Sequence, residues 1–256
     1  MAERGEIIEG MLGSDLACFQ AFSYSRHFLS SCIRVCGFEA SSNTVESPSG
    51  HTTSISYNPI GIDAGRVRRD AAALSVQPKI AAIREMYRGK KIIIGRDKLD
   101  VVRGVTQKLQ AFYKLLADFP EWRGNVVLIQ VTAPSSNESR SLERRVSELV
   151  SHINGEFGSL SFTPVHHYHQ VIERDEYFAL LAVADLALIT SVRDGMNTTS
   201  LEVSSDASYS FCHQPADPDR GFSLSVCHSA RSALPGRDSC GFSTRRWPDG
   251  GQSPST

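Results

Sequence analysis

Hydrophobic residues in the middle of the chain alternate between short unbroken runs and longer stretches with helical spacing. Each unbroken run predicts a strand, and the spaced residues between the runs predict helices. The predicted strands are 92–95, 126–131, 160–165 and 186–190, and the predicted helical faces are 105–116, 142–153 (ended by Asn154-Gly155 as a left-handed cap) and 177–184. Strand and helix recur at intervals of about 30 residues, the length of one βαβ unit. The strands do not alternate with polar residues, as is typical when helices cover both faces, so the pattern predicts an α/β fold with an open, doubly wound parallel sheet.

The chain before this region has the same pattern with weaker signals. The predicted elements are helices over 3–12 and 22–36, strands at 16–19 and 54–58, and a polar loop over 40–50. Asp63 then leads into a basic, alanine-rich stretch that we expect to be helical.

The composition changes abruptly after Glu202. Residues 203–256 contain no Lys, Ile or Met and are rich in Ser, Pro, Gly and Arg. Such a segment buries too little apolar surface to offset the entropy of ordering it, so we expect a disordered or non-native C-terminal tail. Val203-Ser204 can be encoded by GTG-AGT, the form of a splice donor site. We therefore hypothesise that the tail is translated intron or an out-of-frame extension.

Charge and composition exclude several classes of function. The 256 residues hold 27 Lys and Arg against 28 Asp and Glu, a net charge of −1, which gives no reason to expect a nucleic acid or a membrane as partner. No apolar run reaches the ~20 residues of a membrane span, and the acidic N-terminus lacks the order of a secretory signal. We therefore expect a soluble, cytoplasmic protein. Six cysteines are too sparse for a disulfide scaffold.

The sharpest local feature is a glycine-bearing loop, 193–198, that follows the predicted strand 186–190 and opens a helix. Unpaired backbone amides and the positive end of a helix dipole can bind phosphate there. Glu202, inside such a helix, could accept hydrogen bonds from ribose hydroxyls. An ordinary strand-to-helix turn explains the same residues.

A second loop, 95–104, also lies between a predicted strand and a helix. Its three cations, Arg96, Lys98 and Arg103, could neutralise a diphosphate or a sugar phosphate. The alternative is a solvated basic turn.

Neither of two possible metal sites is favoured. Cys32 and Cys36 near His27 are explained more simply as buried thiols, and 166–169 (His-His-Tyr-His) has no carboxylate or cysteine partner close in sequence. Asp217-Pro-Asp219 is similar to the nucleophile pair of a haloacid-dehalogenase phosphatase, but it follows no apolar strand, so we assign it no function.

Together the motifs resemble the glycosyltransferase domain of the trehalose-6-phosphate synthase/phosphatase family. The resemblance is carried, in family order over residues 6–202, by 9–16, 19–28, 58–63, 95–104, 119–124 (Phe-Pro-Glu-Trp-Arg-Gly) and 190–197 (Thr-Ser-Val-Arg-Asp-Gly-Met-Asn). It implies a fold of the two-domain glycosyltransferase-B type, present here in incomplete form. Active synthases of the family transfer glucose from UDP-glucose to glucose-6-phosphate without a metal or other cofactor, so none is expected.

The resemblance also implies site residues. The loop that binds the donor's sugar and diphosphate corresponds to Asp194, Gly195, Met196, Asn197 and Thr198, and the carboxylate that holds the ribose corresponds to Glu202. Lys98 and Arg103 fall where active synthases have an Arg and a Lys beside the donor phosphates, so both residue types are exchanged. A synthase tyrosine is replaced by Val101 or Val102, and Ser136 takes the place of an arginine directed at the acceptor phosphate.

These departures are similar to the fungal trehalose-6-phosphate phosphatases, whose synthase-like domain precedes a phosphatase domain. The resemblance predicts a remnant of the acceptor-side Rossmann domain over 1–62, the first part of the nucleotide-sugar-binding Rossmann domain over 63–202, and the tail over 203–256. We expect a fragment from trehalose biosynthesis whose parent is a trehalose-6-phosphate phosphatase or a synthase-complex subunit. This fragment binds UDP-glucose at most and does not itself transfer glucose. The alternatives are an active trehalose-phosphate synthase and a non-catalytic module that binds other subunits of the trehalose synthase complex.

Overall fold

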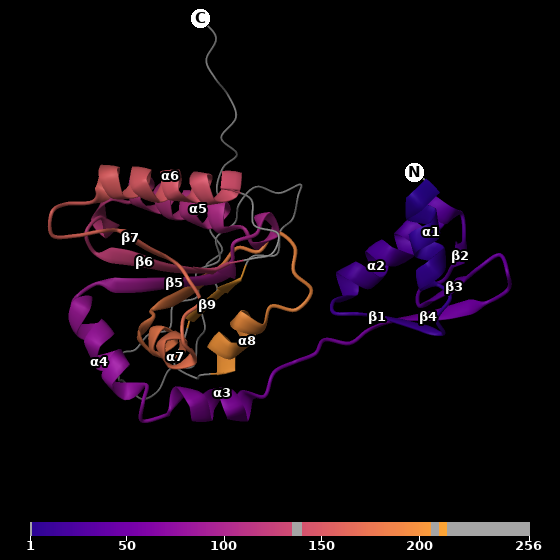
Figure 1. The fold of residues 1–256 in the computed structure, drawn as a ribbon, viewed down its shortest axis with the longest axis horizontal. Helices are drawn as coiled ribbons and strands as arrows, with labels where there is room; N and C mark the ends of the chain where they lie inside the picture. The colour runs from indigo at the N-terminus through magenta and orange to yellow at the C-terminus, as the bar shows by residue number, and fades with distance from the viewer. Residues whose placement is uncertain (1, 135–139, 206–209, 214–256) are drawn as a thin grey trace, which may run out of the picture. The chain divides into compact units, whose positions relative to one another are not determined.

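A computed structural model describes residues 2–134, 140–205 and 210–213 (Figure 1). By its internal contacts the chain divides into two compact units. The first contains residues up to Ile62 together with Gly195–Thr198, and the second contains Asp63–Asp194 and the residues from Thr199 onward.

The first unit is built on a four-stranded sheet with the order β1-β4-β3-β2. β1 and β4 are parallel, and β3 is antiparallel to both of its neighbours. Its elements are α1 (Ala2–Met11), β1 (Leu16–Phe19), α2 (Phe22–Ser31), a π-helical turn (Cys32–Cys36), β2 (Glu39–Ala40), β3 (Thr44–Glu46) and β4 (Thr52–Tyr57). Its small core contains Phe28, Cys32 and Val45.

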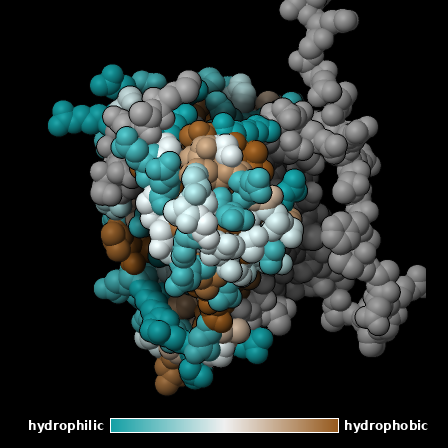
Figure 2. Space-filling view, turned by 90° about the vertical axis from the view of Figure 1, so that its right-hand side faces the viewer, coloured by the Kyte–Doolittle hydropathy of each residue, from teal (hydrophilic) through white to brown (hydrophobic). Residues whose placement is uncertain are grey.

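Large hydrophobic side chains also reach the surface of the first unit. Ile7, Leu16, Phe22, Tyr57 and Ile60 are each more than half exposed. Figure 2 shows hydrophobic groups, in brown, between hydrophilic ones on the face that it presents. None of the helices in the described ranges combines the length and the hydrophobicity that a membrane crossing requires.

The second unit confirms the doubly wound parallel sheet. Its five strands have the order β7-β6-β5-β8-β9, and every neighbouring pair is parallel. Its elements are α3 (Ala64–Ala71), α4 (Gln77–Met86), β5 (Lys91–Lys98), a 3-10 turn (Val101–Arg103), α5 (Val105–Asp118), a second 3-10 turn (Pro120–Trp122), β6 (Val126–Ala133), α6 (Arg140–Phe157), β7 (Val165–His169), α7 (Arg174–Val183), β8 (Leu186–Ile189), α8 (Thr198–Ser205) and β9 (Ser210–His213).

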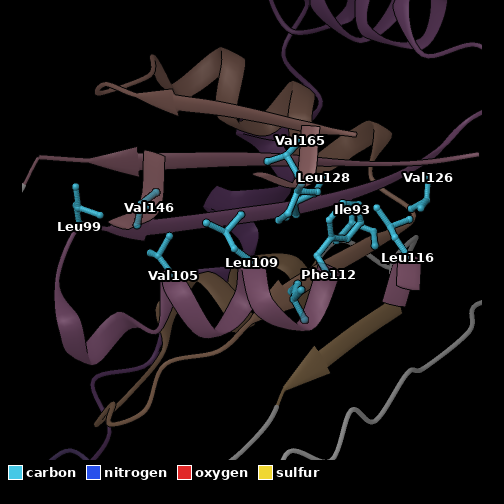
Figure 3. Close-up of a cluster of buried hydrophobic side chains, with 12 residues drawn as sticks. Ile93, Leu99, Val105, Leu109, Phe112, Leu116, Val126, Leu128, Val146 and Val165 are labelled. Carbon is cyan, nitrogen blue, oxygen red and sulfur yellow. The ribbon is translucent and has the colours of Figure 1, made fainter. Parts of the chain in front are cut away.

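Helices cover this sheet from two sides, with α5 and α6 on one face and α4 and α7 on the other (Figure 1). The predicted apolar face of α5 packs against β5 and β6, where Leu109, Phe112 and Leu116 lie beside Ile93 and Leu128 (Figure 3). All of these side chains are buried. The unbroken apolar runs form central strands because both of their faces meet helices.

The prediction of a strand at 160–165 is wrong, as is the predicted helix cap at Asn154-Gly155. The strand next to β6 begins only at Val165, and Leu160 is fully exposed. α6 continues through Gly155 to Phe157, and Gly155 does not have a positive φ. The Asn154 side chain instead bonds the backbone N–H and C=O of Val165, both at 2.9 Å, and so satisfies the start of the edge strand.

Three other predicted segments differ in detail. The polar loop 40–50 contains the short strand β3, because backbone pairing with β4 outweighs the polar side chains there. The helix predicted over 22–36 changes to a π-helical turn at Cys32. Past Glu202, α8 continues to Ser205, and Ser210–His213 pairs in parallel with β8. Asp217 and Asp219 lie outside the described residues.

Candidate functional site

The two loops that the sequence singled out meet at one edge of the second unit's sheet. β5 and β8 are parallel neighbours, with Ile93 opposite Leu186 and Ile94 opposite Ala187. Their carboxyl ends therefore lie at the same edge, and the loops 99–104 and 190–194 leave the sheet there. In open α/β sheets, ligands bind at this edge.

Three contacts join the two loops in register. Thr190 Oγ1 donates to the carbonyl of Gly104 at 2.8 Å, and Val192 N donates to the carbonyl of Val102 at 2.9 Å. Arg103 Nη1 donates to Asp194 Oδ2 at 2.8 Å. Gly104 has a φ of +70°, and a Cβ there would lie 1.9 Å from the Thr190 carbonyl oxygen. Only glycine permits this approach.

Of the three cations in the predicted loop 95–104, Arg96 and Lys98 lie in β5, which continues to Lys98, and only Arg103 lies in the loop. Arg103 is in the ion pair with Asp194, where the side chains are 36% and 16% exposed. Lys98 is the exposed last residue of β5, and the described residues form no ion pair with it. The Arg96 guanidinium carbon lies 4.3 Å from the centre of the Tyr177 ring. Of the three predicted cations, Arg103 is therefore ion-paired, Lys98 is exposed and Arg96 is stacked on an aromatic ring.

Glu202 lies one turn into α8 and accepts a hydrogen bond of 2.6 Å from the Tyr177 hydroxyl to its Oε2. Tyr177 is buried. Burial, and then the Glu202 carboxylate, raise the pKa of Tyr177 far above its ordinary value, so the phenol keeps its proton. The sequence pattern assigned Tyr177 only to the apolar face of a helix. Its contact with Glu202 joins residues 25 positions apart, and a local sequence pattern does not indicate such a contact.

A buried polar cluster lies behind this edge, on the α5 side of β5. Lys108 Nζ donates to Asp97 Oδ2 at 2.6 Å, and Gln130 Nε2 donates to the same oxygen at 3.0 Å. The Lys108 and Asp97 side chains are 0% and 5% exposed. Sequence reasoning missed this cluster. The available signals were a lysine on the apolar face of 105–116 and a glutamine inside the run 126–131.

The remaining predicted site residues lie in the link between Asp194 and α8. Gly195, Met196 and Asn197 are half-buried, and Thr198 begins the helix. By their contacts, Gly195–Thr198 group with the first unit. Ser136 lies outside the described residues.

The histidines of 166–169 lie at the end of the edge strand β7. His167 Nε2 is 2.7 Å from Thr132 Oγ1, and His169 Nδ1 is 3.8 Å from Glu143 Oε1. In the described part of the chain, no three His, Cys, Asp or Glu side chains are grouped so that they could hold a metal ion. Leu12 and Phe38 line a hollow on the first unit, and Asn154 and His166 line one on the second; neither hollow is lined by a predicted site residue.

Comparison with known proteins connects this geometry to a family. The profile of glycosyltransferase family 20 matches residues 1–209. A trehalose-phosphatase of Saccharomyces cerevisiae is 47% identical over 214 residues, which cover 79% of this chain and 24% of that protein. The 56 kDa subunit of the S. cerevisiae UDP-forming α,α-trehalose-phosphate synthase is 44% identical over 202 residues, 78% of this chain and 41% of that subunit.

Solved structures show the same relationship. The N-terminal domain of Candida albicans trehalose-6-phosphate phosphatase is 50% identical and superposes with a TM-score of 0.76 over 80% of this chain and 45% of that one. A UDP-forming α,α-trehalose-phosphate synthase from Burkholderia xenovorans is 26% identical with a TM-score of 0.71, over 78% of this chain and 45% of that one. The chain thus spans a quarter to less than half of these relatives. On the strength of the profile match and these identities, the chain belongs to glycosyltransferase family 20.

Proposed function

We propose that the second unit binds the nucleotide part of UDP-glucose at the carboxyl edge of β5 and β8, within a protein of trehalose biosynthesis. The observation that carries the proposal is the joined pair of loops, which holds Arg103 next to Asp194 at 2.8 Å. Within the second unit, Lys98 and Arg103 would neutralise the diphosphate, Asp194 would contribute from the start of the predicted donor loop, and Glu202 would accept the ribose hydroxyls. The relatives' names, which include UDP-forming synthases, support this choice of donor.

An experiment on the full chain tests the donor site through its charge. Isothermal titration should show that UDP binds more tightly than uridine, and that the difference shrinks as salt is raised, because Lys98 and Arg103 act through charge. Arg103→Gln should weaken UDP binding by roughly tenfold or more, the usual loss for a charge-assisted hydrogen bond.

Arg88→Gln is the matched control for Arg103→Gln. Arg88 is an exposed arginine paired with Glu85, and it lies just before β5 begins, at the opposite edge of the sheet. UDP affinity should be unchanged in this variant. Equal losses in the two variants, or no binding of UDP by the wild-type chain, would refute the proposed site.

We further propose that the 256-residue chain binds the donor without transferring glucose. The exchange of residue types at Lys98 and Arg103 supports this, because lysine and arginine differ in reach and in fork geometry. Incubation with UDP-glucose and glucose-6-phosphate should therefore release no UDP. Formation of trehalose-6-phosphate would establish the alternative, an active synthase.

A second candidate function is a module that binds other subunits of a trehalose synthase complex. The exposed hydrophobic residues of the first unit, among them Ile7, Phe22 and Tyr57, favour it, since exposed apolar patches are typical of protein interfaces. One relative is itself named as a subunit. Co-purification with a purified family synthase, and its loss in Phe22→Ser, would support this function. A cytoplasmic location stays a prediction from the sequence.

A further inference from the structure

Tyr177 connects α7 to the proposed donor site. It lies on α7 and is 6% exposed, and its hydroxyl donates to Glu202. A buried phenol needs a hydrogen-bond partner, and here the partner is the carboxylate assigned to the ribose. The sequence motifs had given Tyr177 no such role.

The contact uses only one side of the carboxylate. Tyr177 donates to Glu202 Oε2 at 2.6 Å, while within the described part of the chain no hydrogen bond is made to Oε1. A carboxylate has about four acceptor positions, so a donor on one oxygen leaves the other available. A side chain fixed in this way loses less rotamer freedom when it binds a ligand.

Two neighbours hold the phenol itself in place. Arg96 lies over the ring, with its guanidinium carbon 4.3 Å from the ring centre. The Thr199 side chain, at the start of α8, lies near the Tyr177 hydroxyl. The phenol is thereby linked to β5 and to α8, the two elements that carry Lys98 and Glu202.

We infer that Tyr177 is a positioning residue that aims Glu202 at the hydroxyl pair of a ribose. This inference rests on the proposed function and adds a requirement for a nucleotide with free 2′- and 3′-hydroxyls. Tyr177 does not touch the ligand. It fixes the carboxylate that does.

The test compares two nucleotides across matched variants of the full chain. Tyr177→Phe keeps the ring and removes the hydroxyl, so UDP should bind about three- to tenfold more weakly, the range for one lost hydrogen bond. Binding of 2′,3′-dideoxy-UDP should change by less than about 1.5-fold, because that ligand offers Glu202 nothing to hold. A merely structural role would weaken both nucleotides alike.

Two further variants separate positioning from folding. Tyr113→Phe is the control, because Tyr113 also donates to a glutamate, Glu156 at 3.4 Å, but on the α5–α6 side of the sheet. It should leave both affinities unchanged. In a Glu202→Gln background, Tyr177→Phe should cause no further loss of UDP affinity, since both changes remove the same interaction.

The possible results are distinguishable. If the wild-type chain does not bind UDP, the proposed function and this inference both fail. If it binds UDP but Tyr177→Phe weakens both nucleotides equally, or tightens UDP, only the inference fails, because Tyr177 would then support the fold or compete for Glu202. A selective loss for UDP, absent from dideoxy-UDP and from Tyr113→Phe, supports it.

Discussion

Gly95 makes room for a buried charged group in the second unit. A Cβ on Gly95 would lie 2.0 Å from Gln130 Oε1 and 2.5 Å from Lys108 Nζ. Neither side chain can withdraw into solvent, because both are fully buried and both donate to Asp97. Removing one partner of such a cluster leaves an uncompensated buried charge. A glycine is therefore needed at this point of β5.

We predict that Gly95→Ala destabilises the second unit by about 2–3 kcal/mol, because the methyl group displaces buried donors. Gly155→Ala is the matched control, since a Cβ at this position in the last turn of α6 would meet nothing within 4 Å. This control should be stabilising by up to about 1 kcal/mol, the helix preference for alanine. Urea unfolding followed by circular dichroism measures both. Equal stabilities of the two variants would contradict the account.

At the scale of elements, the sheet that contains β7 shows which strands can be predicted from the sequence and which cannot. The central strands β5, β6 and β8 were predicted from unbroken apolar runs, because central strands must be apolar on both faces. β7 is an edge strand, and after Val165 it consists of the polar run 166–169, for which the sequence predicted no strand. Its start is set by Asn154, a contact that a local pattern does not contain.

The candidate site, too, was predicted only in part from the sequence. The loops 95–104 and 190–197 were predicted because glycine and charge follow apolar strands. Their three mutual contacts, and the contact of Tyr177 with Glu202, join residues that are distant in sequence, so only the folded sheet reveals them. The Lys108 cluster was missed because a helix face is predicted to be apolar when most of its residues are apolar, and a single lysine does not change that prediction.

The histidines of β7 should make the free energy of unfolding depend on pH. Burial, and then the neighbouring His169, lower the pKa of His167 below its ordinary 6.5, and burial lowers that of His166. In acid the unfolded chain therefore binds more protons than the folded chain. The free energy of unfolding should fall as the pH decreases through about 6.5. Besides His169, Thr132 bonds His167, Glu143 faces His169, and the titratable Tyr87 packs edge-on against His166.

Thermal unfolding at about pH 7.5 and pH 5.5 measures this dependence. His167→Gln can keep a hydrogen bond to Thr132 while it removes the titrating group, so it should reduce the loss of stability on acidification. His152→Gln is the control, because the His152 side chain is 60% exposed. A loss that is the same in wild type and in His167→Gln would show that other groups cause it.

At the scale of the whole molecule, the family match and the sheet order together support our proposal of a binding site at one edge. The chain matches glycosyltransferase family 20 over residues 1–209, and the loops after β5 and β8 meet where open α/β sheets bind their ligands. The relatives it spans only in part include trehalose-phosphatases and trehalose-phosphate synthases. Our central proposal is therefore that UDP binds the second unit at this edge.

Hydrogen exchange measured by mass spectrometry, with and without UDP, tests that claim most directly. We predict slower exchange in peptides that cover 99–105 and 190–202, because a bound diphosphate would reduce the local opening of both loops. Peptides of β7 and of the α5–α6 face should exchange at unchanged rates. Protection confined to one of the two loops, or found only outside them, would contradict the account.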